Sequence, residues 1–271
     1  MLISLEGMNA TGKTTLAYSG PLPIVGFAFD MGWERAIYGT KHKELFAGLN
    51  IEVIEFDPDK LEPDPITADI TIYELPQPIQ LDGMKLHGYT MLWTYFIVRL
   101  GVVLGNRAIR TIVLDTATTM RRVKADAHLE ALQGTPEGKN RIQLIQIEYG
   151  KVNDPIRNIY TSTKSTRQNL VAVHHLTDER KDQMNAKGEM VQVLTGRKIL
   201  EGLGNTSDFM DCSLLMEKDG KGGTVATWLK CGYNLAYEKQ KVSNPTWDML
   251  VELLVMATGG SLKLDRRKVL A

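Results

Sequence analysis

The chain opens on Leu2-Ile3-Ser4-Leu5-Glu6-Gly7-Met8-Asn9-Ala10-Thr11-Gly12-Lys13-Thr14-Thr15, which carries the pattern G-x-x-x-x-G-K-[ST]. A stretch suited to a strand precedes the pattern and a stretch suited to a helix follows it, the context in which such a loop binds phosphate. Glycines let successive main-chain N–H groups point at one anion, and the helix presents its positive end. We therefore predict a phosphate site made by Gly7, Asn9, Ala10, Thr11, Gly12, Lys13, Thr14 and Thr15.

Two side chains of this loop predict ATP and Mg²⁺ as ligands. Lys13 is expected to contact the β- and γ-phosphates, and the Thr14 hydroxyl to bind the metal. A carboxylate for the same metal is expected at Asp115, which ends the strand pattern Thr111-Ile112-Val113-Leu114 and would lie at the ligand-binding edge of a sheet. The alternative role for Asp115 is to cap the helix that follows.

Hydrolysis also requires a group that orients or deprotonates the attacking water. Asp30 and Glu34 are the candidates, because they follow the strand pattern at 24–29; solvated surface charge is the alternative. His174 and His175 end another strand pattern, at 169–173, and one of them is placed to sense the γ-phosphate. Side chains alternate between the faces of a strand, so only one can point to the ligand, and we assign this role to His174.

Strand and helix patterns alternate along the rest of the chain, which predicts an α/β fold with a mostly parallel sheet and flanking helices. Further strands are expected at 51–56, as an edge strand, and at 212–216 and 224–229, as a C-terminal β-hairpin. Helices are expected at 90–105, 118–132, 140–165 and 246–257.

One domain is expected over residues 1–258, followed by a basic tail at 259–271. Prolines and acidic residues crowd at about 57–88, which predicts an insertion with a small hairpin at 69–74. The charged segment 177–189 contains a turn signal at 185–188. We expect an extended stretch at 190–194 and a short helix beginning at 195–197.

Bulk composition limits the possible partners. The 271 residues include 32 Lys plus Arg and 32 Asp plus Glu, a formal net charge of zero, so any contact with nucleic acid requires a local patch. Cys212 and Cys231 do not form a disulfide framework. The most apolar stretch, 91–104, is too short to span a bilayer and contains Arg99. We expect a cytoplasmic protein with no membrane contact, in the host cytoplasm if a phage encodes it.

The motifs above, with Asp30-Met31-Gly32-Trp33-Glu34-Arg35 and Leu194-Thr195-Gly196-Arg197-Lys198, resemble the RecA-like P-loop ATPases. The resemblance is to the bacteriophage AAA-domain type, which includes single-strand-annealing and recombinase-like ATPases. It implies a RecA-like core, with the strand at 169–173 between the phosphate-loop strand and the Asp115 strand. It also implies a homo-oligomer with ATP at the subunit interface and DNA-facing loops at about 133–141 and 177–190. The candidate cations that would act on a neighbouring subunit are Arg180, Arg197 and Lys198.

The chain departs from that pattern at Gly32, where RecA-like enzymes usually carry a glutamate; Glu34 is the nearest substitute. We expect a Mg²⁺-dependent ATPase that acts on single-stranded DNA in phage-type recombination or replication. One alternative is a nucleoside monophosphate kinase, because Ser4-Leu5-Glu6-Gly7 resembles the start of thymidylate-type kinases. The other is an assembly or packaging ATPase with a protein partner.

Overall fold

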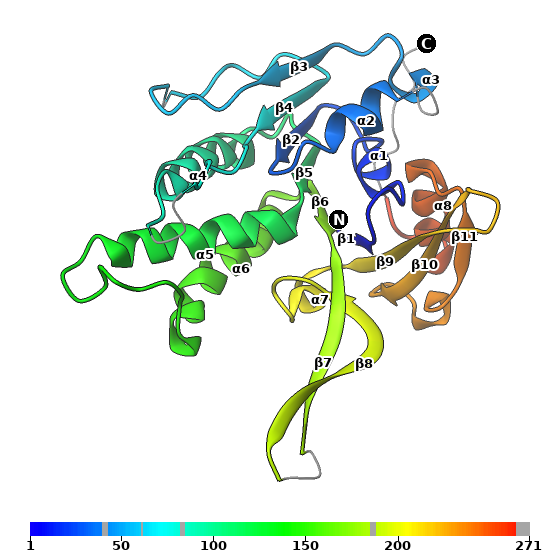
Figure 1. Ribbon diagram of the computed structural model, residues 1–271. Helices are drawn as coiled ribbons and strands as arrows, with labels where there is room; N and C mark the ends of the chain where they lie inside the picture. The colour runs from blue at the N-terminus through cyan, green and yellow to red at the C-terminus, as the bar shows by residue number, and fades with distance from the viewer. Residues whose placement is uncertain (40–42, 61, 82–84, 185–187, 264–271) are drawn as a thin grey trace.

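The computed structural model describes residues 1–39, 43–60, 62–81, 85–184 and 188–263. Nine strands form one sheet in the order β11-β10-β9-β1-β6-β5-β2-β4-β3 (Figure 1). The seven strands from β9 to β3 run parallel, and β10 is antiparallel to both β9 and β11. The strands are β1 (Leu2–Gly7), β2 (Ile24–Ala28), β3 (Ile51–Ile54), β4 (Ile70–Glu74), β5 (Thr111–Asp115), β6 (Asn169–His174), β9 (Cys212–Lys218), β10 (Thr224–Cys231) and β11 (Lys241–Ser243).

The order of the central strands confirms the expected core. β6 lies between β1, which leads into the phosphate loop, and β5, which ends at Asp115. These three strands are buried along their whole length, as expected for parallel strands with both faces covered. β3 lies at the edge of the sheet and is half-buried, as its alternating pattern predicts. The β9–β10 pair confirms the C-terminal hairpin.

Helices cover both faces of the sheet (Figure 1). One face packs against α4 (Tyr89–Gly105), α5 (Ala117–Gln133), α6 (Tyr149–Thr166) and the short α7 (Thr206–Phe209). The other face packs against α1 (Lys13–Ala17), α2 (Trp33–Tyr38), α3 (Lys43–Phe46) and α8 (Trp247–Ala257). No helix among the described residues is long and apolar enough to cross a bilayer. Cys212 and Cys231 are buried free thiols.

Two sequence-based expectations about elements are wrong. The segment at 69–74 is not a hairpin but β4, which pairs in parallel with both β2 and β3. The long helix expected from residue 140 begins only at Tyr149, after the 3₁₀ turn Gln146–Glu148. The chain before this turn is held by an ion pair between Arg141 Nη1 and Glu148 Oε1 at 2.6 Å, which the helical pattern of the sequence does not reveal.

A two-stranded ribbon projects from the body of the protein (Figure 1). It consists of β7 (Leu176–Met184) and β8 (Met190–Leu200), paired antiparallel. The short helix expected to begin at 195–197 is therefore wrong, because β8 continues through these residues to Leu200. Gly196 has a φ of +77° beside an irregular step in the pairing, and a positive φ next to a bulge lets the strand continue past it. Part of the predicted turn, 185–187, and most of the basic tail, 264–271, lie outside the described residues.

Candidate functional site

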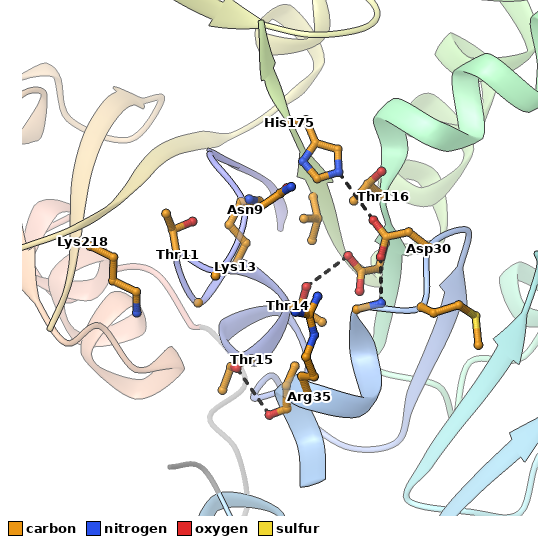
Figure 2. Close-up of a pocket in the computed structure, with 17 residues that line it drawn as sticks. Asn9, Thr11, Lys13, Thr14, Thr15, Asp30, Arg35, Thr116, His175 and Lys218 are labelled. Atoms are coloured by element: carbon orange, nitrogen blue, oxygen red, sulfur yellow. Dashed lines mark hydrogen bonds and ion pairs between the residues drawn. The ribbon is translucent and has the colours of Figure 1, made fainter. Parts of the chain in front are cut away.

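The predicted phosphate loop and the ends of three strands surround one cavity of about 680 Å³ (Figure 2). Asp30 follows β2, Asp115 ends β5, and His175 follows β6. All lie at the carboxyl end of the parallel sheet, where open α/β sheets bind ligands. The lining residues are Asn9, Ala10, Thr11, Gly12, Lys13, Thr14, Thr15, Asp30, Met31, Gly32, Arg35, Ala36, Asp115, Thr116, Val173, His175 and Lys218.

The phosphate loop has the backbone that its glycines predict. Gly12 has a φ of +90°, in the left-handed region that favours glycine. A Cβ at Gly7 would overlap the carbonyl oxygen of Met216 on β9, so Gly7 permits close packing of the loop against the sheet. Of the eight predicted phosphate-site residues, Gly7 is the one that does not line the cavity. The first N–H groups of a helix have no intrahelical acceptor, so those at the start of α1 are available to an anion.

The Lys13 ammonium group lies inside the loop. Its Nζ donates hydrogen bonds to the carbonyl oxygens of Gly7, at 2.8 Å, and Met8, at 2.7 Å. Burial lowers the pKa of Lys13 to about 8, although the negative charges of Asp115 and Asp30 act in the opposite direction. An anion placed against this group would favour its charged form, so the loop is suited to phosphate.

Thr14 and Asp115 form a second part of the site. The Thr14 hydroxyl donates a hydrogen bond to Asp115 Oδ1 at 3.2 Å. Asp115 is fully buried, and among the described residues its Oδ2 has no hydrogen-bond partner. Burial and the charge of Asp30 together raise the pKa of Asp115 to about 8, although the hydrogen bond from Thr14 and the charge of Lys13 act in the opposite direction. A nearby cation would stabilise the ionised form of this carboxyl group. The alternative role, as the N-cap of α5, is taken by Thr116, whose side chain accepts a hydrogen bond from the Thr119 N–H.

This donor set fits Mg²⁺ in the form that accompanies a nucleotide. Mg²⁺ typically binds one or two protein oxygens and completes its shell with water and substrate phosphates. The Thr14 hydroxyl and the unpartnered Asp115 oxygen supply that number of protein groups. Within the described residues, no group of three or more His, Cys, Asp or Glu side chains is placed to hold a metal without such help.

Asp30 and His175 lie next to each other in the lining of the cavity (Figure 2). His175 Nε2 lies 3.5 Å from Asp30 Oδ2, and the Gly32 N–H donates to Asp30 Oδ1 at 3.1 Å. Burial raises the pKa of Asp30, but hydrogen bonds from His175 and Gly32 and the charge of Lys13 outweigh it, and the net pKa is lowered. Asp30 is therefore an ionised carboxylate beside an imidazole, two groups that can hold and move a proton.

Two predicted catalytic residues are not brought into this cavity. His174 is 1% exposed, does not line the cavity and has its pKa lowered by burial to about 3. The alternation of strand side chains places His175 at the cavity instead. Glu34 is an exposed residue of α2 and is also absent from the lining, because the turn after β2 directs Asp30 inward. The structure thus brings His175 and Asp30 to the cavity, and not His174 or Glu34.

Arg35 and Lys218 are lining residues that sequence reasoning missed. Arg35 lies on α2, one residue after Glu34. Lys218 ends β9, which pairs with β1 so that Met216 is opposite Gly7, and its Nζ donates to the Thr224 hydroxyl at 3.3 Å. Arg35 could have been found from the sequence, because it follows the candidate Glu34 in the same helix. Lys218 could not, because it reaches the loop only through the pairing of β9 with β1, which no motif indicates. Together with Lys13 they make the cavity suited to a polyanion.

Other predicted cations lie elsewhere. Arg180, Arg197 and Lys198 are on the ribbon, and Lys198 Nζ pairs with Asp178 Oδ1 at 2.7 Å. The basic cluster at the start of α5 has structural partners. Arg121 donates to Asn153 Oδ1 at 3.1 Å, and Arg122 pairs with Glu201 at 3.2 Å.

Comparisons with known proteins identify no family. Neither protein-family models nor curated proteins gave a match. Among solved structures, the chain is similar to the KaiC-like protein PH0186 from the hyperthermophilic archaeon Pyrococcus horikoshii OT3, with 10% identity and a TM-score of 0.43. The match covers 89% of this chain and 83% of that chain. The chemistry of the cavity therefore carries the functional conclusion.

Proposed function

We propose that this protein is a Mg²⁺-dependent ATPase of the RecA-like type. The observation that carries the proposal is the convergence, in one cavity, of a phosphate loop, a buried carboxylate and an Asp–His pair. The first binds a triphosphate, the second suits a metal cation, and the third suits an attacking water. ATP is the substrate that uses all three.

Thr14 and Asp115 are the residues that would hold Mg²⁺. When bound, the metal neutralises charge on the phosphate oxygens. The chain's own contribution is to keep the Asp115 carboxylate dry and aligned through the Thr14 hydroxyl, 3.2 Å away. Lys13 places a second positive charge at the end of the same loop, and Arg35 and Lys218 flank the cavity.

Asp30 is assigned as the general base toward water, and His175 as the residue that positions it. The lowered pKa of Asp30 keeps the carboxylate ionised, and the imidazole at 3.5 Å can hold its orientation. The main chain of His175 is fixed independently, because its N–H donates to the Thr118 hydroxyl at 3.0 Å and its carbonyl accepts from the Glu201 N–H at 2.9 Å. These two contacts tie His175 to α5 and to the residue that follows β8.

Single-stranded DNA and further copies of this chain are the proposed partners, in phage-type recombination or replication. The ribbon supports this part of the proposal, because β7 is mostly exposed and nearly all of it lies within 177–190, the segment that the RecA-like resemblance assigns to DNA. The kinase alternative rests on Ser4-Leu5-Glu6-Gly7. There the Ser4 hydroxyl donates to Glu6 inside the sheet, away from the cavity lining.

The test is the rate of ATP hydrolysis with and without single-stranded DNA, measured for four proteins. Wild type should hydrolyse ATP and be stimulated by DNA. Lys13→Ala should lose nucleotide affinity, because it removes the ammonium group from the phosphate loop. Asp30→Asn should lower kcat by about 10²- to 10⁴-fold with little change in nucleotide binding.

Glu34→Gln is the matched control, since it neutralises a carboxylate four residues from Asp30 that faces solvent. It should keep the wild-type rate. Equal losses in Asp30→Asn and Glu34→Gln would remove the assignment of the base. Phosphate transfer to thymidine monophosphate would favour the kinase, and a stable protein complex with no DNA effect would favour the assembly ATPase.

A further inference from the structure

A second cavity lies at the opposite end of the strands that carry the nucleotide pocket. Its volume is also about 680 Å³. Arg110 precedes β5, which ends at Asp115, and Gln168 precedes β6, which is followed by His175. β5 has five residues at about 3.3 Å each, so the two cavities are separated by about 16 Å of strand. They share no lining residue.

Three arginines line this cavity, and none of its lining residues within the described chain is Asp or Glu. The lining residues are Leu104, Gly105, Arg107, Ile109, Arg110, Ser165, Thr166, Arg167 and Gln168. The formal net charge of the chain is zero, so this cluster of positive charge is a local feature of the cavity. Within the described residues, the guanidinium groups of Arg107 and Arg167 have no hydrogen bond or ion pair. We call this the arginine cavity.

The walls of the arginine cavity are built by a buried side chain. Gln168 is 4% exposed, and its Nε2 lies 2.9 to 3.2 Å from the carbonyl oxygens of Val103, Asn106 and Ile109. Its Oε1 accepts a hydrogen bond from the Thr166 hydroxyl at 2.7 Å. Gln168 therefore ties the end of α4 to the end of α6 and fixes the two segments that carry the arginines.

Arg167 occupies a backbone conformation that favours glycine. It caps α6 with a φ of 61°, the left-handed conformation in which helices usually end on Gly. A residue with a Cβ is strained there. A glycine would be easier to accommodate at this position. The presence of an arginine therefore suggests a role for its side chain, which lines the cavity.

The negative ends of two helix dipoles offset only part of the positive charge in the arginine cavity. α4 and α6 both end at the arginine cavity, and each carbonyl end carries about half a negative charge. Arg107 and Arg167 are the lining arginines without a partner among the described residues. The two helix ends offset about one of these two guanidinium charges, which leaves about one in excess. This remaining charge calls for an anion from outside the chain.

We propose that the arginine cavity binds phosphate groups. Guanidinium forks match phosphate oxygens in pairs, and the Ser165 and Thr166 hydroxyls can add single donors. None of the described residues that line the cavity is aromatic, so they offer bases no stacking surface and the contact is to phosphate. The phosphates come either from the backbone of a nucleic acid or from a small phosphate ion, and the experiment separates these sources.

The experiment uses the full chain with Arg107, Arg110 and Arg167 changed together to Gln. One arm measures binding of fluorescein-labelled oligothymidylate by anisotropy across a salt series. The other arm measures pyrophosphate binding by calorimetry, with Lys13→Ala present in every protein to remove the phosphate loop as a competitor. A control triple, Lys43→Gln, Lys85→Gln and Lys151→Gln, changes the net charge equally at exposed positions outside the cavity.

If nucleic acid is the source, the cavity triple weakens oligothymidylate binding and lowers the slope of log K against log salt by about 2. If a small phosphate is the source, only pyrophosphate binding is lost. Either result supports the site, provided that the control triple stays near wild type. Unchanged binding in both arms, or equal losses in the control triple, would overturn the proposal.

Arg167→Gly separates binding from folding. Glycine relieves the left-handed backbone, so the melting temperature should hold or rise while phosphate binding falls about tenfold. A variant that binds normally would count against the proposal. Affinity for ATP should remain at the wild-type value in all of the arginine variants, so a failure here is distinct from a failure of the proposed ATPase activity.

Discussion

Lys13 and Asp115 are charged side chains that the fold holds deep in the nucleotide pocket, with exposures of 5% and 0%. Burial brings both pKa values to about 8, one from above and the other from below. The fold thus disfavours both charges that ligand binding requires. Mg²⁺ and phosphate would each supply the missing opposite charge, so nucleotide binding is linked to the exchange of protons.

This linkage predicts how affinity depends on pH. Below pH 8 the free protein holds a proton on Asp115, and Mg²⁺ requires the carboxylate, so binding releases about one proton and affinity rises up to about tenfold per pH unit. Above pH 8 Lys13 loses its own proton, and the rise ends. Calorimetry with a non-hydrolysable ATP analogue and Mg²⁺ from pH 6 to 9 measures this profile.

Asp115→Asn is the control, because it keeps the shape of the side chain and removes the titration. Its affinity should be lower at pH 8 and should lack the additional rise seen in wild type. The nucleotide's own phosphates titrate identically with both proteins and cancel in the comparison. Parallel profiles for the two proteins would contradict the role given to Asp115.

Sequence reasoning at single positions succeeded where a motif fixes geometry. The loop from Asn9 to Thr15 and Asp115 line one cavity as predicted. The structure does not bring His174 to the cavity, and the sequence could not show this, because 170–173 is apolar throughout, and a strand buried on both faces gives no alternation from which to choose between adjacent histidines. Glu34 and Asp30 could not be separated, since the path of a turn depends on the neighbouring strand.

Among the elements, the ribbon shows what a local pattern cannot reveal. β7 and β8 are stabilised by pairing with each other, and their side chains are mostly exposed, so no hydrophobic periodicity marks them. The Asp178–Lys198 ion pair at 2.7 Å closes the base of the ribbon. β4 was missed for a different reason: prolines on both sides of 70–74 suggested an excursion, although the strand itself is buried.

Shortening the ribbon tests its role without disturbing the core. Replacing residues 179–197 by Asn-Gly joins Asp178 to Lys198 through a two-residue turn suited to antiparallel strands. Because the described residues among those removed are nearly all exposed, the melting temperature should change by less than about 3 °C. Basal ATP binding should be kept, whereas stimulation by single-stranded DNA should disappear.

The variant Gln183→Ala with Gln192→Ala keeps the full ribbon and should behave as wild type. DNA stimulation that survives the shortening would place the DNA contact elsewhere, with the arginine cavity as the next candidate. Loss of ATP binding in the shortened protein would instead show that the ribbon supports the pocket itself.

The arrangement of the complete chain follows from one topological feature, the insertion of β6 between β1 and β5. The RecA-like resemblance implied this order, whereas hydrophobic patterns gave the strands but not their neighbours. The same order places ligand-binding residues at one end of β5 and β6 and the arginine cavity at the other. The second site could not be predicted from sequence, because Arg107 and Arg110 are distant from Arg167 until α4 and α6 end side by side.

Assembly of several chains is the last prediction, and mixing two inactive variants tests it. Lys13→Ala disables a subunit's own pocket but leaves its ribbon intact, while Arg197→Gln does the reverse. If Arg197 acts on ATP in a neighbouring subunit, as an arginine finger does, each variant alone is inactive. In an equal mixture of the two, about a quarter of the interfaces join an intact pocket to an intact arginine.

The mixture should therefore recover ATPase activity that neither variant shows, and size-exclusion chromatography with ATP and Mg²⁺ should show a species larger than the monomer. Lys198→Gln is the matched control, because Lys198 is already paired with Asp178 of its own subunit and its loss should leave hydrolysis nearly unchanged. A monomer with ATP, or an inactive mixture of subunits shown to exchange, would contradict Arg197 as the cation supplied in trans.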